Sequence, residues 1–111
     1  MKTTVMAVVA MMGIGVAAAA AAQDAKVAKG EEVYAAQKCG MCHSIGDKGN
    51  KKGPLDGVGA KLKPAEIREW MTDAKGMTAK TKATRKPDMK SYALPADDLD
   101  AIVAYMASLK K

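Results

Sequence analysis

The chain is poor in aromatic residues and in side chains that bind metals. It has no phenylalanine, aromatic residues make up 4% of its 111 residues, and it carries one histidine and two cysteines. So few large rings leave little bulk for a core, and a domain of this size usually needs a staple, a metal, a cofactor or a partner. The moderate charge and the 49% of hydrophobic residues argue against a collagen-like, mucin-like or disordered chain. The length allows one small domain.

The sequence also lacks internal repeats and, after its first 22 residues, the alternating β-branched pattern of a strand. Apolar residues and helix formers instead follow a helical pattern in three stretches. Helices are predicted over residues 30–38, 64–73 and 96–109. Long irregular segments are predicted over residues 44–63 and 77–95, and connections of that length are usually functional. The fold class is therefore all-α.

The first 22 residues look like a secretory leader. Lys2 and the amino terminus give a cationic start, an apolar and alanine-rich run follows, and small residues stand at its exit. Cleavage after Ala22 would leave residues 23–111 as the mature domain, exported to the periplasm. An uncleaved membrane tether is the alternative, but an alanine tract partitions weakly into lipid. No cysteine follows the exit, so no lipid anchor is predicted.

The residues that carry chemistry lie together in Cys39-Gly40-Met41-Cys42-His43. On a helix, both thiols and the imidazole would project from one face, because Cys42 and His43 follow Cys39 at helical spacing. This pattern suits covalent haem attachment. Each thiol can form a thioether with a vinyl group of the porphyrin while the adjacent imidazole reaches the iron.

Three other uses of the same residues fit less well. A disulfide across such a short gap would close a tiny loop and stabilise the chain little. A structural zinc site normally needs about four ligands, and the chain has no second cysteine pair to complete the set. A thioredoxin-like redox pair would need a strand before it and a βαβ setting. Haem attachment is favoured, and a haem would also supply the missing core bulk.

The order of motifs along the chain resembles that of the small monohaem class I cytochromes c. The resemblance rests on Gly30-x-x-x-Tyr34, the Cys39–His43 motif, Gly53-Pro54, Trp70 and a methionine before a C-terminal amphipathic helix. It covers nearly all of the chain after the leader. It implies a cytochrome c fold, with three main helices wrapped around one covalently attached haem. It also implies that Gly30 and Tyr34 cross the last helix near Tyr105, where a missing side chain lets the backbones approach.

The resemblance further implies that the sixth ligand of the iron is a methionine from the second long loop. Four of the nine methionines lie in the predicted leader. Three others are expected to pack: Met41, Met71 and Met106. Met77 and Met89 remain, both expected in the loop. Met89 stands in a stretch that resembles the ligand loop of the family, with Pro87 beside it and an aromatic residue three positions on. Met89 is the predicted ligand opposite His43, and Met77 is the alternative.

Three further residues are assigned by the same resemblance. The carbonyl group of Pro54 is the expected acceptor for the second ring N–H of His43, which would fix the imidazole. Trp70 would donate its indole N–H to a haem propionate, and its alternative role is that of a half-buried core aromatic. Tyr92 is expected to cover the haem edge near Met89.

A thioether sulfur opposite an imidazole favours ferrous iron and leaves no open position on the metal. These ligands describe a carrier that accepts one electron from one protein and passes it to another, and not an enzyme. The alternative is a haem-based gas sensor or ligand-binding cytochrome with a displaceable sixth ligand. A haem peroxidase would want a distal base, and the only histidine is already used.

The basic residues indicate the kind of partner. Without Lys2, the 18 basic side chains become 17, which against 12 acidic ones leaves a net charge of +5. A basic ring is expected to flank the exposed haem edge: Lys48, Lys51, Lys52, Lys80, Lys82, Arg85, Lys86 and Lys90. Such a ring would steer the protein to an acidic patch on a redox partner, although lysines in loops are often simply solvated. No nucleic-acid partner is expected, because the basic residues are not interleaved with aromatic ones. A monomer is expected.

Overall fold

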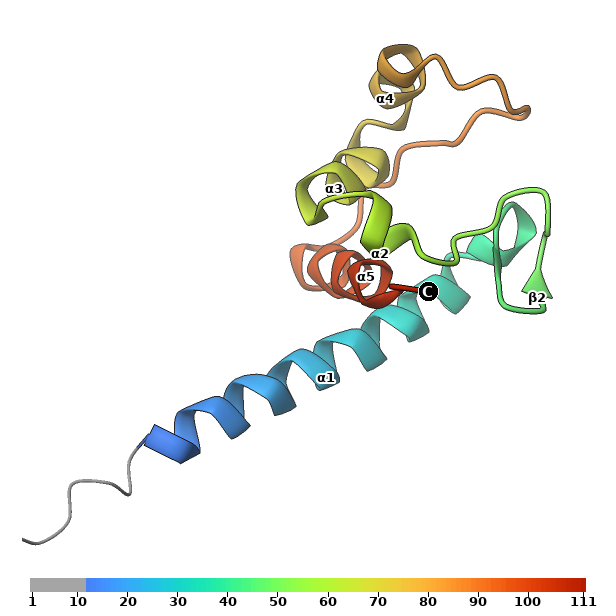
Figure 1. Cartoon of the computed structure of the whole chain (residues 1–111). Helices are drawn as coiled ribbons and strands as arrows, with labels where there is room; N and C mark the ends of the chain where they lie inside the picture. The colour runs from blue at the N-terminus through green and yellow to red at the C-terminus, as the bar shows by residue number, and fades with distance from the viewer. Residues whose placement is uncertain (1–11) are drawn as a thin grey trace, which may run out of the picture.

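The structure is a computed structural model that describes residues 12–111. Helix α5 (Ala96–Ser108) lies between the C-terminal half of the long helix α1 (Met12–Ala36) and helix α3 (Pro64–Thr72), as Figure 1 shows. Helix α4 (Ala74–Thr81) follows α3 and leads into the connection 82–95. The remaining elements lie between α1 and α3: the 3-10 turn η1 (Cys39–Met41), strands β1 (Ser44–Ile45) and β2 (Lys48–Gly49), and helix α2 (Val58–Lys61).

The crossing of α1 and α5 depends on Gly30, which is buried. A Cβ atom at this position would overlap with the carbonyl oxygen of Ala101 and would lie 2.6 Å from Cβ of Tyr105. Beside it, the rings of Tyr34 and Tyr105 meet edge to face, with 5.9 Å between their centroids. The predicted close approach of the two helices at Gly30 is confirmed.

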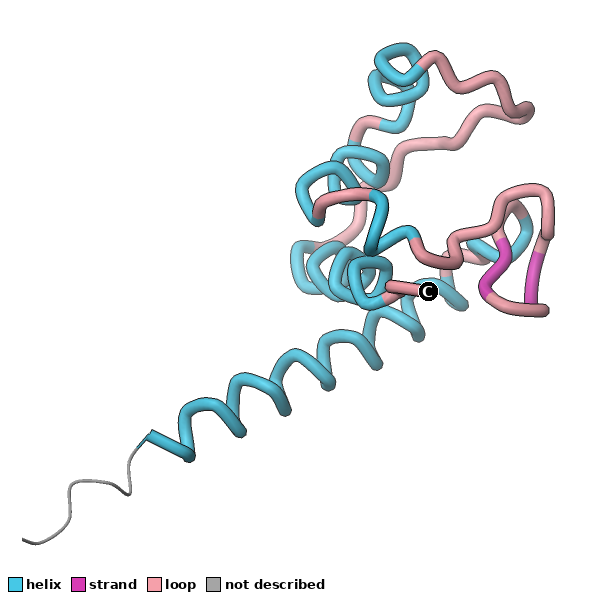
Figure 2. The backbone as a smooth tube through the Cα atoms, viewed as in Figure 1, coloured by secondary structure: helices cyan, strands magenta, loops and turns pink. Residues whose placement is uncertain are grey.

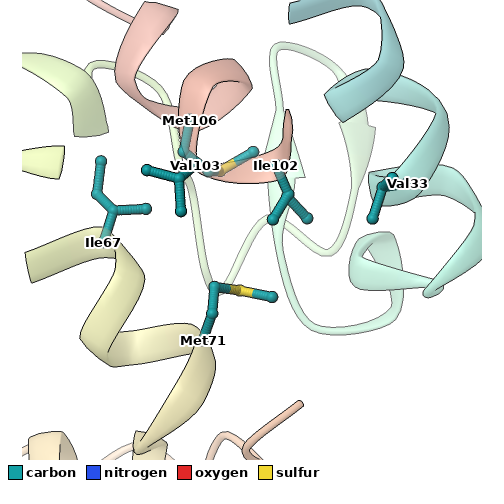
Figure 3. Packing of buried hydrophobic residues seen from close by; sticks show 6 residues of the cluster. All are labelled: Val33, Ile67, Met71, Ile102, Val103 and Met106. Atoms are coloured by element: carbon teal, nitrogen blue, oxygen red, sulfur yellow. The ribbon is translucent and has the colours of Figure 1, made fainter. Parts of the chain in front are cut away.

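The hydrophobic core is small and joins three helices. Figure 3 shows its six buried members: Val33 from α1, Ile67 and Met71 from α3, and Ile102, Val103 and Met106 from α5. Partly buried side chains from the loops, among them Cys39, Met89 and Tyr92, pack against this cluster. The expectation that Met71 and Met106 pack is confirmed. The same expectation for Met41 is wrong, because this side chain is 72% exposed on the η1 turn.

The three predicted helices are present, with shifted ends. Pro64 is the first residue of α3, and the carboxylate of Glu66 accepts a hydrogen bond of 3.0 Å from the N–H of Lys63, which satisfies a free donor at the helix start. Helix α1 begins well before residue 30 and ends at Ala36. It stops there because Lys38 adopts a left-handed conformation with φ 56°, which no helix can continue through.

Segment 44–63, predicted to be irregular, contains a hairpin and a short helix. Strands β1 and β2 pair antiparallel, with Ser44 opposite Gly49 and Ile45 opposite Lys48. Gly46 turns the chain between them with φ 59°. The expectation of no strand was wrong here, because strands of two residues are too short to show an alternating pattern.

Segment 77–95 was predicted to be irregular from its first residue, yet it begins inside α4. The side chain of Asp73 caps this helix by accepting a hydrogen bond of 3.1 Å from the N–H of Gly76. Helix α4 buries only Ala74 and Met77, which is too few residues for an apolar stripe, and Asp73 is the local sequence signal of its start. Met77 therefore lies in a helix, and its predicted place in the loop is wrong.

Helix α1 is continuous across the predicted end of the leader. Residues 18–26 are exposed and Val27 is half-buried. The N-terminal half of α1 thus extends away from the other elements (Figure 2). Among residues 12–111, no helix combines the length and the apolar character needed to cross a membrane. The beginning of the predicted leader, residues 1–11, lies outside the described residues.

Candidate haem-binding site

The Cys39–His43 segment forms a tight turn and does not continue α1. The backbone N–H groups of Cys42 and His43 both donate to the carbonyl oxygen of Cys39, at 3.1 and 2.9 Å. The His43 bond spans four residues, as in one turn of α-helix, so the imidazole stays one turn from Cys39 although the helix itself has ended. Cys39 and His43 therefore keep the predicted spacing of one turn, although the segment is a short 3-10 turn and not part of a helix.

Both cysteines carry free thiols, and Cys39 is the more buried of the two. Burial raises the pKa of the Cys39 thiol, and the positive charge of Lys90 opposes this shift. Burial raises the pKa of the Tyr92 hydroxyl, and the nearby charges of the two cysteines raise it further. Cys39, Met89 and Tyr92 all pack against the same core cluster, so the cysteine turn and the connection 82–95 lie close together.

The imidazole of His43 is half-buried and oriented by its backbone neighbours. Its Nδ1 atom lies 3.0 Å from the carbonyl oxygen of Gly53. Because a carbonyl group can only accept, Nδ1 carries the hydrogen and Nε2 presents its lone pair. Burial lowers the pKa of His43, the bond to Gly53 opposes this, and the nearby charge of Arg85 lowers it further. The neutral ring, which is the form that binds a metal, is favoured.

The acceptor of the histidine bond is Gly53 and not Pro54, so the role predicted for Pro54 is wrong. The N–H of Ser44 donates to the carbonyl of Gly53 at 3.1 Å, and the N–H of Leu55 donates to the carbonyl of Ser44 at 2.8 Å. These two bonds fix the register between the segments so that the carbonyl of Gly53 faces the ring. Sequence reasoning identified the Gly-Pro motif as a unit but assigned the bond to its second residue.

Met89 lies in the connection between α4 and α5 and is partly buried against the core cluster. Two hydrogen bonds hold this connection to the end of α3 and the start of α4: the N–H of Tyr92 donates to the carbonyl of Met71 at 2.7 Å, and the N–H of Ala74 donates to the hydroxyl of Ser91 at 2.9 Å. In Figure 1, the connection (orange) and the hairpin (green) project to the same side of the helices. Met89 of this connection and Cys39 of the cysteine turn pack against the same core cluster.

The other predicted site residues are distributed around this region. Tyr92 is half-buried, and Nζ of Lys90 lies 5.0 Å from the centroid of its ring. Trp70 is half-buried on α3 but does not pack against the core cluster, unlike Ile67 of the same helix. This counts against its alternative role as a core aromatic. Met77, in α4, is 4% exposed.

The set of groups fits a covalently attached haem. Two free thiols stand one short turn apart, an imidazole has its Nε2 lone pair available, and a half-buried thioether lies on a connection close to the thiols. In a comparison with models of protein families, residues 27–110 match the family described as Cytochrome c. The chain belongs to the cytochrome c family. Searches of curated proteins and of solved structures found no match.

Membership in the cytochrome c family confirms the all-α fold built for a covalent haem with iron. Cys39 and Cys42 have the spacing that such an attachment uses. Cytochromes c bind haem and transfer electrons between redox partner proteins, and they are typically carriers rather than enzymes. This cytochrome c is therefore a haem-binding electron-transfer protein.

Proposed function

We propose that this cytochrome c is a periplasmic protein that carries one electron at a time between two redox partners. In this proposal Cys39 and Cys42 hold the haem through thioether bonds. His43 and Met89 would ligate its iron. The haem, when bound, supplies the one-electron couple of its iron, and the protein supplies the ligands, their orientation and the surrounding charge.

The hydrogen bond from His43 to Gly53 is the observation that carries the proposal. It holds the ring in one tautomer and one orientation, as is typical of a histidine that binds a metal. The carbonyl of Gly53 is itself held by the N–H of Ser44. Since the ring is positioned by the backbone, little rearrangement is needed when the charge of the iron changes.

Three features support Met89 over Met77 as the second ligand. Met89 lies on a connection without regular structure, which is anchored at Tyr92 and can present a side chain across the site. Met89 and its neighbour Tyr92 pack against the same core cluster as Cys39 of the cysteine turn. Met77 lies in a regular helix, where a buried methionine commonly fills gaps in the packing.

With His43 and Met89 both bound to it, the iron would have no position left for a substrate. The soft sulfur favours the ferrous state and raises the reduction potential. Both properties suit a carrier and not a catalyst. A displaceable sixth ligand would instead describe the gas-sensing alternative.

The visible spectrum of haem-loaded protein tests the ligands. The wild type is expected to show a low-spin ferric spectrum with the weak far-red band of sulfur bound to iron. Met89→Ala should lose this band and bind carbon monoxide readily when reduced, whereas Met77→Ala should keep it. Loss of the band in Met77→Ala alone would overturn the assignment. A high-spin wild type that binds carbon monoxide would favour the gas sensor.

Export with removal of residues 1–22 is part of the proposal. Its support is the cationic start, the alanine-rich run and the small residues at Ala22. Residues 18–26 are exposed on α1, so cleavage there removes few packing contacts. The mature protein in a periplasmic extract should begin at Gln23, and its mass should include one haem. A protein retained in the membrane fraction with its first residues intact would contradict this part.

We further propose that the basic ring docks the protein, as a monomer, on acidic patches of its partners. The lysines of the ring are exposed: Lys48, Lys51, Lys52, Lys80, Lys82, Lys86 and Lys90. Long-range attraction of this kind speeds encounter and is screened by salt. The rate of electron transfer to a partner should therefore fall steeply as ionic strength rises. A flat response would show that these lysines are only solvated.

A further inference from the structure

Arg85 is less exposed to solvent than the neighbouring residues of the basic ring. It is half-buried, whereas its neighbours are exposed: Lys80, Lys82, Lys86 and Lys90. Lys80 lies 4.0 Å from a carboxylate oxygen of Glu69, and Lys86 lies 2.8 Å from one of Asp88. Within residues 12–111, no ion pair includes Arg85. A cation used only for docking would extend into water, so the half-buried guanidinium indicates an internal role.

The guanidinium of Arg85 lies against Gly53. A Cβ atom at Gly53 would overlap with Nη1 of Arg85 and would lie 2.9 Å from its Cζ atom. The same Cβ atom would overlap with the carbonyl oxygen of Cys42. Because Gly53 has no side chain, the guanidinium reaches the backbone segment that holds His43. Arg85 itself belongs to the connection 82–95, which carries Met89.

We infer that Arg85 is a positioning residue that fastens the Met89 connection to the Gly53 segment and places a fixed positive charge beside the backbone that holds His43. The inference rests on the proposed ligands, His43 and Met89. Its physical basis has two parts, which separate in experiment. The guanidinium packs against Gly53 from the connection 82–95, and its charge would act on the iron from a half-buried position.

The charge of Arg85 should raise the reduction potential. A nearby cation destabilises ferric iron more than ferrous iron, since the ferric state carries one more positive charge. The half-buried position screens this effect less than the exposed positions of the neighbouring lysines do. Fastening the connection should also weaken the binding of an added ligand that competes with Met89.

The test compares four haem-loaded proteins: wild type, Arg85→Gln, Arg85→Lys and Lys86→Gln. The reduction potential reports the charge, and the affinity of the ferric protein for imidazole, which competes with Met89, reports the fastening. Lys86→Gln is the matched control, because it removes the same charge from the next, exposed residue. Circular dichroism shows that each variant is folded.

For Arg85→Gln we expect the ratio of ferric to ferrous protein at a fixed potential to rise about tenfold, which is equivalent to a reduction potential lower by about 59 mV. We also expect the ferric variant to bind imidazole about tenfold more tightly. Arg85→Lys should keep most of the potential, because the charge remains, yet bind imidazole more tightly, because the planar fork is lost. Lys86→Gln should change each value less than about threefold.

Equal shifts of the potential in Arg85→Gln and Lys86→Gln would overturn the inference, since Arg85 would then be one more member of the basic ring. Unchanged imidazole affinity in both Arg85 variants would also overturn it. The far-red band of the wild type separates this failure from that of the proposed function. A wild type without the band refutes Met89 as ligand, whereas a wild type with the band and an unaffected Arg85→Gln refutes only the role of Arg85.

Discussion

The crossing of α1 and α5 at Gly30 supports the whole site, because α1 leads directly into the cysteine turn. Gly30→Ala adds one methyl group at this crossing. The new Cβ atom would overlap with the carbonyl oxygen of Ala101 and would come within 2.6 Å of Cβ of Tyr105, whereas real Cβ atoms essentially never lie closer than 3.0 Å to such neighbours. Neither obstacle can rotate away, because one is backbone and the other is attached to it.

The size of the effect follows from two opposing terms. Overpacking a well-packed site costs about 1–3 kcal/mol, and the immovable neighbours of Gly30 place this substitution at the upper end, near 3 kcal/mol. Alanine is favoured over glycine within a helix by about 1 kcal/mol. We therefore expect the unfolding free energy of the haem-loaded protein to fall by about 2 kcal/mol, which corresponds to a melting temperature lower by about 8–16 °C in a domain of this size.

Denaturant unfolding followed by circular dichroism measures this loss. Gly40→Ala is the matched control, because a Cβ atom at Gly40 meets only the Cα atom of Gly49, at an ordinary 3.9 Å. The control should change the unfolding free energy by no more than about 0.5 kcal/mol. A Gly30→Ala protein as stable as the wild type would refute the close crossing, because only the gain in helix propensity would then be left.

Three further predictions concern the core and the surface. Ile102→Ala should lower the unfolding free energy by about 2–5 kcal/mol in denaturant titrations, because this side chain is 1% exposed at the centre of the cluster. Arg68→Ala should cost no more than about 1 kcal/mol by the same measurement, since its ion pair with Asp100 is about half exposed on both sides. Burial of Tyr34, whose hydroxyl has no hydrogen-bond partner among the described residues, raises its pKa from 10.0 to about 12. The contribution of Tyr34 to stability is complete below pH 10.0, where the hydroxyl is neutral in both states. As the pH rises through about 12 the unfolded state ionises first, so this contribution to stability is lost. Tyr34→Phe should therefore be as stable as the wild type or more so at neutral pH, and should lose less stability over this alkaline range.

Local patterns in the sequence were sufficient for the main helices and for the kind of cofactor. The apolar stripe of residues 96–109 corresponds to α5, and Pro64 begins α3. The cysteine and histidine spacing indicated a covalent haem, in agreement with the family to which the chain belongs. The close packing at Gly30 was expected only from the resemblance to cytochromes c, and the structure confirms it. The other features follow from residues within a few turns of one another.

The features that were missed depend on how distant segments meet. The acceptor for His43 is Gly53 and not Pro54, because pairing with Ser44 sets the register of that segment. Met77 lies in a helix that begins with a side-chain cap at Asp73 and shows no apolar periodicity. The separate position of Arg85 could not be read from a run of basic residues, because the sequence does not show which of them turns inward.

The chemistry of this protein was thus set by neighbouring residues along the chain, because the two thiols that attach a haem and the imidazole that ligates its iron stand within about one turn of one another. The groups that surround the cysteines and the histidine were set by contacts between segments far apart in the sequence. A carbonyl group becomes the partner of a ring, and a guanidinium becomes internal, only when backbone hydrogen bonds and packing bring the segments together. Such contacts reflect the balance of burial, register and charge over the folded chain, which no local pattern contains.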